Sequence, residues 1–319
     1  MTELEKPIDG SGAEQSISTL VCHSHVDMAI DCLGSAARRC SSPLWFTIHD
    51  DGTLDETDRV RLTERLGRVR IIERREADEV VSDRMRAYPN ALALRESYPH
   101  IMKAMDAVIY CECDTFVAMD SDVLFLRNFR SPFRDAKAAI FIEDREPSYS
   151  LRSWGYLMSK GLTLPKKVNV GITCIRKADV DFDFLEWFVS QARHHSIPYV
   201  VEQTFWAALG ARLGCRVFDP AQVRVMRAGE NDAALVAGHF TARSRHLLPS
   251  YVQRAGQASD DAAPVTLATL DPGECATLDL AWYELRRVPE KIVREVSRRS
   301  GGSNDDKSQP VRPMSDGAS

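Results

Sequence analysis

Short apolar runs and amphipathic segments alternate along the first part of the chain. Residues 17–22, 44–48 and 69–72 are apolar runs of the length expected for strands. Between them, residues 27–39 and 54–66 carry apolar side chains at helical spacing. Strand, helix, strand, helix, strand is typical of a doubly wound α/β sheet. The pattern therefore predicts an α/β fold with helices flanking a sheet.

The pattern continues at lower regularity towards residue 250. Thr53 and Glu56 have the spacing of a capping box for the second helix. Further elements are expected at 76–108 (helical, with breaks at Pro89 and Pro99), 115–119, 138–142 and 167–175 (strands), and 202–213 (helix). Composition divides the chain into a disordered tail (1–16), an α/β domain (17–250), a polar linker (251–275), a basic amphipathic helical segment (276–299) and a second disordered tail (300–319).

Two carboxylates directly follow the strand predicted at 115–119. Asp120–Ser121–Asp122 lies between that run and the apolar residues 123–126. Carboxylates between apolar segments need compensation, and a divalent cation that carries a diphosphate would supply it. Hard oxygen ligands suit Mg²⁺ or Mn²⁺. The sequence therefore predicts a solvent-facing carboxylate pair at the C-terminal end of a strand, where α/β sheets bind ligands. The alternative is a simple turn between two strands.

A second Asp-x-Asp triplet provides an internal comparison. Asp181 and Asp183 precede an apolar helical segment, where aspartate is favoured as an N-cap and as a partner of the helix dipole. We therefore predict a structural role for this triplet. The contrast shows that the spacing alone is weak evidence and that its position in the fold must decide.

Composition excludes several classes of function. The chain has 319 residues and a net charge of −5, which argues against general nucleic-acid binding. No apolar run reaches the ~18 residues of a membrane span, and the N-terminal residues have no apolar signal segment. These features predict a cytoplasmic protein. The chain contains neither G-x-G-x-x-G after its first strand nor G-x-x-x-x-G-K-[ST], so dinucleotide oxidoreductases and P-loop enzymes lose support.

Four motifs, in order, resemble the GT-A glycosyltransferases, and most of all the glycogenin and lipopolysaccharide-galactosyltransferase group (glycosyltransferase family 8). They are Tyr98–Pro99–His100–Ile101–Met102–Lys103, Asp120–Ser121–Asp122, Asn169–Val170–Gly171 and Gly238–His239–Phe240. The resemblance covers about residues 17–248. It implies a GT-A type mixed sheet and a metal-dependent hexosyltransferase that uses a nucleotide sugar, taken here as UDP-linked, with retention at the sugar carbon.

The resemblance also implies roles for individual residues. Asp120, Asp122 and His239 would hold Mn²⁺ or Mg²⁺, with Ser121 beside the donor. Lys103 and Arg245 would contact the donor and its diphosphate, with Arg243 as a competitor for the second role. Asn169 and Gly171 would lie beside the donor sugar, as would Glu202 and Gln203. Base and ribose contacts are expected from His23, Ser24 and Asp51, at the ends of the first two strands.

The chain also departs from the family pattern. The group has Asp-Gln where this chain has Glu202–Gln203. Glu202 could stabilise oxocarbenium charge or attack the anomeric carbon, or it could simply be a partner of the helix dipole, and the change from Asp to Glu disfavours the nucleophilic role. His246–Leu247–Leu248 replaces the group's Lys-Pro-Trp, so the acceptor pocket is expected to differ. The acceptor could be a glycan, a lipid-linked glycan or a small molecule.

The basic segment resembles one by which some bacterial members contact the inner leaflet of the membrane. Its aromatic side chains and cations suit such an interface, whereas its glutamates and Pro289 favour packing against the catalytic domain. Two further readings of the whole chain stay open: an inactive scaffold protein that binds sugar nucleotides, and a nucleotidyltransferase. The second is disfavoured because Cys22–His23–Ser24–His25–Val26–Asp27 contains no glycine and no lysine or arginine.

Overall fold

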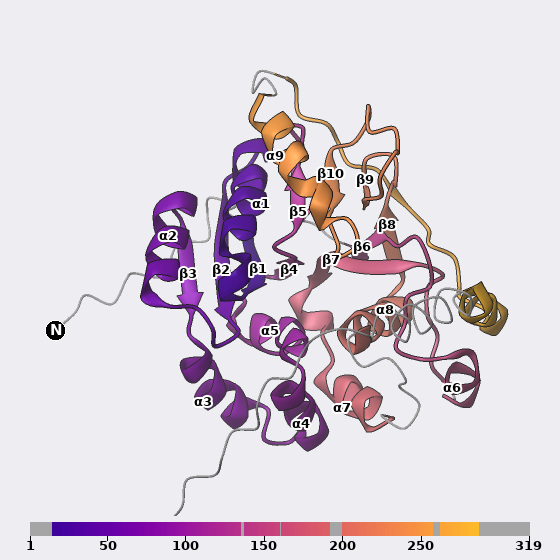
Figure 1. Ribbon diagram of the computed structural model, residues 1–319. Helices are drawn as coiled ribbons and strands as arrows, with labels where there is room; N and C mark the ends of the chain where they lie inside the picture. Colours follow the sequence, from indigo (N-terminus) through magenta and orange to yellow (C-terminus); the bar gives the residue numbers. More distant parts are fainter. Residues whose placement is uncertain (1–14, 135–136, 160, 192–199, 258–261, 287–319) are drawn as a thin grey trace, which may run out of the picture.

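The computed structural model describes residues 15–134, 137–159, 161–191, 200–257 and 262–286. An eleven-stranded sheet lies at the centre of these residues, with helices packed around it (Figure 1). Its strands are β1 (Gln15–Val21), β2 (Leu44–Asp50), β3 (Val69–Ile72), β4 (Thr115–Met119), β5 (Val123–Phe125), β6 (Ala139–Glu143), β7 (Val168–Arg176), β8 (Cys215–Phe218), β9 (Val223–Val225), β10 (Ala237–His239) and β11 (Thr269–Leu270).

The helices follow the expected alternation over the first third of the chain. They are α1 (Val26–Arg39), α2 (Glu56–Leu66), α3 (Arg74–Arg84), α4 (Pro89–Ser97), α5 (Asp106–Tyr110), α6 (Ser153–Met158), α7 (Phe182–Ser190), α8 (Val201–Leu213) and α9 (Leu248–Gln257), with short 3₁₀ turns that include η2 (His23–His25) and η3 (Pro99–Lys103). Residues 277–286 are also helical. The prediction of an α/β fold is confirmed.

Two local predictions differ from the structure. The broken helix expected at 76–108 is four separate elements, α3, α4, η3 and α5. Pro89 begins α4 at its first turn, and Pro99 does the same for η3, because proline suits the start of a helix. Each of the two prolines therefore separates two helical elements and begins the second of them.

The capping box of α2 is made by other residues than the predicted Thr53 and Glu56. Asp55 is the N-cap, and its Oδ1 accepts a hydrogen bond from the Asp58 backbone N–H at 2.8 Å. Asp58 returns the bond by accepting from the Asp55 N–H at 3.2 Å. Thr53 instead donates its hydroxyl to Asp51 at 2.6 Å. Two carboxylates at the positive end of the helix dipole account for the difference.

The second Asp-x-Asp triplet has the predicted structural role. Asp181 is the N-cap of α7, and its side chain accepts a hydrogen bond from the Phe184 N–H at 2.8 Å. Asp183 lies in the first turn of the same helix.

Strand β4 is buried on both faces, which explains its continuous apolar sequence. Phe116 and Ala118 belong to one core cluster, whereas Val117 and Met119 belong to the cluster on the opposite face. Because successive side chains of a strand point to opposite faces, all four of these positions must be apolar. The strand therefore carries the chain through the middle of the core to Asp120.

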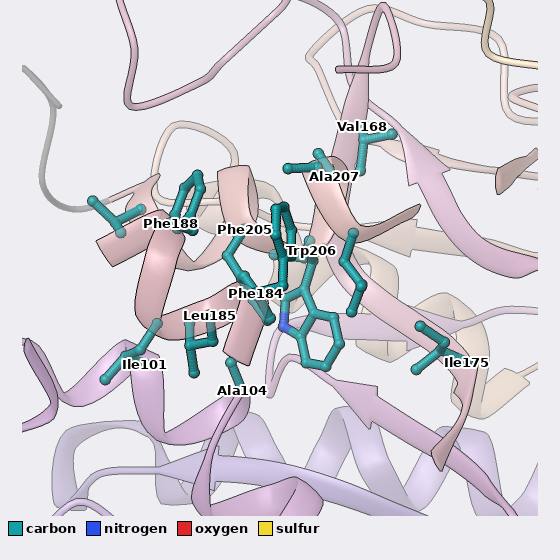
Figure 2. Close-up of a cluster of buried hydrophobic side chains, with 14 of the residues drawn as sticks. Ile101, Ala104, Val168, Ile175, Phe184, Leu185, Phe188, Phe205, Trp206 and Ala207 are labelled. Atoms are coloured by element: carbon teal, nitrogen blue, oxygen red, sulfur yellow. The ribbon is translucent and has the colours of Figure 1, made fainter. Parts of the chain in front are cut away.

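Helix α8 supplies the largest side chains of one core cluster. Figure 2 shows Phe205 and Trp206 of this helix beside Phe184, Leu185 and Phe188 of α7. Trp206 also stacks on Phe116, with 5.5 Å between ring centroids. Since Glu202 and Gln203 are in the first turn of α8, this packing determines where they lie.

Gly210 allows α8 to approach the sheet closely. A Cβ atom at this position would lie 2.7 Å from Cε2 of Phe141, which is fully buried. We expect Gly210→Ala to lower the free energy of unfolding by about 1–2 kcal/mol, because overpacking outweighs the better helix propensity of alanine. Urea unfolding measures this. Gly34→Ala in α1 is the matched control: its nearest contact is the flexible end of Arg38, so stability should stay unchanged or rise. Equal losses in both variants would contradict the prediction.

The direction of strand winding reverses between β1 and β4. β1 pairs in parallel with β2 on one side and with β4 on the other, and β2 pairs in turn with β3. Open α/β sheets bind ligands outside the carboxyl ends of strands at such a switch point. Val21 ends β1 and Met119 ends β4, so Asp120 enters the loop at this place.

The C-terminal third contacts the same sheet. Helix α9 runs across the domain boundary expected at residue 250, and β11 pairs antiparallel with β8 inside the predicted linker. Of the predicted basic segment, residues 277–286 are helical, and its remainder lies outside the described residues, as do residues 1–14 and 300–319 of the two predicted tails. Among the helices that the structure describes, none has the length and apolar character needed to cross a bilayer.

Candidate functional site

The Asp-x-Asp triplet forms a tight turn between β4 and β5. The Asp120 N–H donates to the Gly171 carbonyl at 2.9 Å, which ties the turn to β7. The Val123 N–H donates back to the Asp120 carbonyl at 3.2 Å. The turn therefore has both of its ends held by strands, and Asp120 and Asp122 project from a rigid support.

His239 reaches this turn through strand pairing. β5 runs antiparallel to β10, and the ladder places His239 opposite Val123. The Phe240 N–H also donates to the Asp122 carbonyl at 2.8 Å. The ladder thus holds residues that are far apart in sequence next to each other.

Asp120, Asp122 and His239 together form a group that can hold a metal ion. One side-chain ligand atom from each residue lies within 4.8 Å of the other two. His239 Nε2 is 3.0 Å from Asp122 Oδ1 and 3.6 Å from Asp120 Oδ2. Asp122 Oδ1 is buried, and while His239 is neutral with its proton on Nδ1, this oxygen accepts no hydrogen bond within the described residues. A buried carboxylate oxygen without a donor is costly, and a divalent cation would compensate it. Two carboxylates and one imidazole suit Mg²⁺ or Mn²⁺.

The prediction that both carboxylates face solvent is wrong for Asp122. The residue is 3% exposed, whereas the side chain of Asp120 is 25% exposed. Burial alone would raise the pKa of Asp122, but His239 and hydrogen bonds from Arg245 lower this pKa to about 2. Burial would lower the pKa of His239, yet Asp122 and Asp120 raise it. Without a metal, the ionised Asp122 therefore favours the protonated form of His239.

Asn169 determines which nitrogen of His239 faces the carboxylates. Asn169 Oδ1 accepts a hydrogen bond from the Gly171 N–H at 2.9 Å, so this atom is the amide oxygen. The same oxygen lies 2.7 Å from His239 Nδ1, which must then carry a proton and donate it. With Nδ1 as the donor, neutral His239 presents the lone pair of Nε2 to Asp120 and Asp122. Asn169 thus acts on the metal group through His239.

Gly171 gives His239 its space. A Cβ atom on Gly171 would lie 2.3 Å from His239 Nδ1 and 2.7 Å from Cε1. Opposite this part of β7, the pairing of β6 shifts register between Phe141 and Ile142. A glycine inside a strand often marks a close approach, and here the approaching group is the imidazole ring.

Lys103 lies between two acidic side chains. Its Nζ is 2.7 Å from Asp120 Oδ1 and 3.3 Å from Glu202 Oε2. Burial lowers the pKa of Lys103, but the two carboxylates outweigh this and raise it, so the ammonium stays charged. Burial raises the pKa of Glu202 to about 7, against the pull of Lys103. The single ammonium of Lys103 cannot neutralise both carboxylates, and it lies closer to Asp120 than to Glu202. Glu202 is therefore the acid that holds a proton near neutral pH.

This pKa predicts how stability depends on pH. Glu202 has a folded-state pKa of about 7 against an ordinary value of 4.5, so between these values the folded state binds more protons than the unfolded state. Its contribution to stability should therefore fall as pH rises from about 4.5 to 7, by at most about 1.4 kcal/mol per pH unit. Urea unfolding of wild type and Glu202→Gln across this range measures the difference. A wild type that gains stability relative to the Gln variant as pH rises would contradict the assignment.

Arg245 closes the other side of the metal group. Its Nε and Nη2 donate to Asp122 Oδ2 at 3.0 and 2.8 Å, and its Nη1 lies 3.1 Å from His25 Nε2. Arg243, the competitor for the diphosphate role, is exposed and lines the same cleft. Arg245 therefore contacts a predicted metal ligand directly, and Arg243 does not have this contact.

A cleft of about 540 Å³ opens at the metal group. Eight of the predicted site residues line it: Lys103, Asp120, Asp122, Asn169, Glu202, Gln203, His239 and Arg245. Gly171 lies behind the His239 ring, and Ser121 is buried in the turn. His23, Ser24 and Asp51 do not line the cleft. His23 Nδ1 is 2.6 Å from Asp58 Oδ2 at the start of α2, a contact that gives it a local structural partner.

The structure adds residues that sequence reasoning missed. Asp144 follows β6 and lines the cleft, and it accepts a hydrogen bond from Gln203 Nε2 at 3.4 Å. Its position after a predicted strand, as for Asp120, was a signal that could have identified it. His25 contacts Arg245, although the predicted site residues include only its neighbours His23 and Ser24. No local pattern distinguishes these three positions.

Comparisons with known proteins give a structural match without a sequence match. No protein-family model matches the chain, and no curated protein matches it by sequence. The structure is similar to mouse xyloside xylosyltransferase 1 in its apo form, with a TM-score of 0.51 and 11% identity over 73% of this chain and 99% of that chain. A galactosyltransferase, LgtC, solved with donor and acceptor sugar analogues, gives a TM-score of 0.48 and 14% identity over 78% of this chain and 98% of that chain. The similarity to the xylosyltransferase structure confirms the predicted resemblance in fold to glycosyltransferases.

Proposed function

We propose that this protein is a metal-dependent glycosyltransferase that moves a sugar from a nucleotide-sugar donor, UDP-linked, to a glycan, a lipid-linked glycan or a small molecule. The observation that carries the proposal is the convergence of Asp120, Asp122 and His239 at the switch point of the sheet, on the wall of a cleft. The similarity in fold to a xylosyltransferase supports the same class of reaction.

The three residues would hold Mn²⁺ or Mg²⁺, each through one side-chain atom. When bound, the ion would supply Lewis-acid stabilisation of the diphosphate leaving group. Arg243 and Arg245 line the same cleft and carry positive charge for phosphate oxygens. Asn169 keeps the Nε2 lone pair of His239 directed at the two carboxylates. Together, these residues would bind the anionic diphosphate and the cation that accompanies it.

The sugar side of the proposal involves Lys103, Glu202 and Gln203. Gln203 is held by a hydrogen bond from its Nε2 to the Ser148 carbonyl at 2.6 Å, and its Oε1 lies 3.5 Å from Asn169 Nδ2. A Glu202 carboxyl that holds a proton near neutral pH is a poor nucleophile, so we assign it to orienting Lys103. Gln203 and Asn169 would then face the donor sugar. Retention at the sugar carbon stays a prediction from the family resemblance.

Equilibrium binding of UDP with and without Mn²⁺, followed by a donor-hydrolysis assay across several UDP-sugars, tests the proposal. We expect UDP to bind at least roughly tenfold more tightly with Mn²⁺, because a cation held by Asp120, Asp122 and His239 would compensate the charge of the diphosphate. We also expect slow hydrolysis of at least one donor. Metal-dependent UDP binding without hydrolysis or transfer for any donor would favour the alternative, an inactive sugar-nucleotide-binding scaffold. Absence of metal-dependent binding would contradict both.

A cytoplasmic location and contact with the inner membrane leaflet remain predictions. In the described part of the basic segment, Leu278, Trp282 and Leu285 are exposed. Their i, i+4, i+7 spacing places them along one side of the helix at 277–286. Such a face suits an interface, but the cations beyond residue 286 lie outside the described residues.

A further inference from the structure

A second hollow, of about 460 Å³, adjoins the cleft that contains the metal group. Arg145, Glu146 and Tyr283 line both the cleft and this hollow, so the two border each other at these residues. The hollow lies between the helix at 277–286 and the segments around residues 146 and 166. We call it the basic groove. Its lining consists of Arg145, Glu146, Pro147, Lys166, Lys167, Asp279, Trp282, Tyr283 and Arg286.

The helix that forms one wall of the basic groove is held firmly in place. Glu284 accepts hydrogen bonds from the N–H of Ser153 at 2.7 Å and from its hydroxyl at 3.2 Å. Leu280 is 1% exposed and belongs to a core cluster. Just before the helix, the Cys275 N–H donates to the Leu164 carbonyl at 2.8 Å. The groove is therefore a built feature of the fold with a fixed wall.

The charge of the groove is opposite to that of the whole chain. Four cationic and two acidic side chains line it, which leaves a net charge of +2, whereas the chain carries −5. Lys166 Nζ lies 3.4 Å from Asp279, and Arg145 pairs with Glu230. Among the described residues, no acidic side chain forms an ion pair with Lys167 or Arg286. These two cations remain available for an anionic ligand.

An aromatic ring accompanies the free cations. Trp282 lines the groove and is 62% exposed, although leaving so much apolar surface in water is unfavourable. Tyr283 is partly buried where the groove meets the cleft. Exposed indole rings with neighbouring polar groups are typical of binding surfaces, because one side chain supplies a rigid apolar platform at low entropic cost. A sugar ring has apolar C–H faces that such a platform can cover.

From these observations we propose that the basic groove binds the acceptor, and that the acceptor is an acidic glycan, which carries a phosphate or a carboxylate next to a sugar ring. This inference rests on the proposed glycosyltransferase function, since it assigns the donor to the metal-containing cleft. Trp282 covers one face of the ring, and Lys167 and Arg286 bind the acidic group. Because the groove borders the cleft at Arg145, Glu146 and Tyr283, a neighbouring sugar of the same acceptor would extend towards Gln203, which lines the cleft.

Binding of small sugars to the full chain tests the groove without the donor. The probes are glucose, glucose 6-phosphate, glucuronic acid and inorganic phosphate. Their binding is measured by tryptophan fluorescence and by ligand-observed NMR. We expect at least one acidic sugar to bind roughly tenfold more tightly than glucose, because a charge-assisted hydrogen bond is added. The phosphate and carboxylate probes distinguish the two sources of negative charge. Equal affinities for glucose and both acidic sugars would overturn the inference. So would an affinity for inorganic phosphate equal to that for glucose 6-phosphate, since the ring would then contribute nothing.

Matched variants locate the binding in the groove. Lys167→Gln should remove most of the preference for the acidic sugars, and Trp282→Ala should weaken all three sugars severalfold. Lys137→Gln removes an exposed lysine that does not line the groove, and Leu285→Ala removes an exposed side chain from the same helix. Both controls should bind as wild type does. Losses in the controls equal to those in the groove variants would overturn the assignment to this site.

Two readouts separate this inference from the proposed function. Binding of UDP with Mn²⁺ should be unchanged in Lys167→Gln and Trp282→Ala, because neither residue lines the cleft with the metal group. Absence of this binding in wild type would refute the transferase proposal, whereas sugar binding in the groove is measured without the donor. The acceptor role requires that the tighter-binding acidic sugar changes the rate of donor hydrolysis or becomes glycosylated itself. If that sugar binds and leaves the fate of the donor unchanged, the groove is not the acceptor site.

Discussion

Replacing Asp122 with asparagine is expected to lower metal-dependent turnover by about a thousandfold or more. Asp122 is the most buried carboxylate of the metal group, and its Oδ1 lies 3.0 Å from His239 Nε2. Asparagine keeps the shape of the side chain but removes its negative charge, so the cation loses one of its two anionic ligands. Because the cation would stabilise the charge that develops on the leaving group, its loss should cost several kcal/mol at the transition state. Donor hydrolysis and Mn²⁺-dependent UDP binding measure the effect.

The stability of the variant must be measured beside its activity. Asp122 has a lowered pKa, so its ionised form contributes stability that is present above the unfolded-state pKa near 3.8 and is lost as pH falls towards about 2. Removing the charge leaves Arg245 and His239 without their anionic partner, so we expect some loss of stability at pH 7. Asparagine is preferable to alanine because it avoids a cavity as well.

Asp183→Asn is the matched control for this experiment. It changes a carboxylate of the other Asp-x-Asp triplet, in the first turn of α7 and outside the cleft. Its turnover should remain within about twofold of wild type. Near-wild-type turnover of Asp122→Asn in added Mn²⁺, with the protein folded, would refute the assignment of Asp122 as a metal ligand.

Gly171→Ala is expected to weaken the binding of Mn²⁺ by about a hundredfold. The new methyl group would lie 2.3 Å from Nδ1 of His239, and the ring must move to accommodate it. The ring has little freedom, since its side chain is 5% exposed and its Nδ1 is bonded to Asn169. Any movement breaks this bond and turns Nε2 away from Asp120 and Asp122. Disturbing the groups that orient a ligand typically costs 10–100-fold in metal affinity, and here the ligand itself is displaced.

Calorimetric titration with Mn²⁺ in the presence of UDP measures this loss directly. Gly210→Ala serves as the control for crowding, because it places a methyl group 2.7 Å from a core side chain that is remote from the metal group. We expect that variant to lose stability and to keep its metal affinity. A Gly171→Ala variant that binds Mn²⁺ as wild type does would show that His239 is not a ligand.

The two largest predicted effects involve the same group of contacting residues. Asn169 Oδ1, Gly171 and His239 form one packed unit that connects β7 and β10. β7 also pairs with β4, which delivers Asp120. The metal group therefore depends on three strands of the sheet, β4, β7 and β10, and none of its members is placed by a flexible loop alone.

Local patterns in the sequence were sufficient for the α/β alternation, for the strand that leads to Asp120, and for the N-cap role of Asp181. Each of these depends on interactions within a few residues: side-chain alternation along a strand, apolar spacing along a helix, and a cap that bonds to a nearby N–H. The candidate residues Asp120, Asp122 and His239 were identified through an ordered set of motifs, and the fold brings them within reach of one ion.

The remaining features of the site depend on the tertiary structure. Asp122 is buried because β5 pairs with β10 and because Arg245 covers it, and no neighbour in the sequence indicates either contact. The raised pKa of Glu202 follows from its burial in the fold, which outweighs the nearby Lys103, and the basic groove exists only where the helix at 277–286 packs near Lys167. These features depend on strand order and packing between distant segments, whereas periodicity in a sequence reports only which face of its own element a residue occupies.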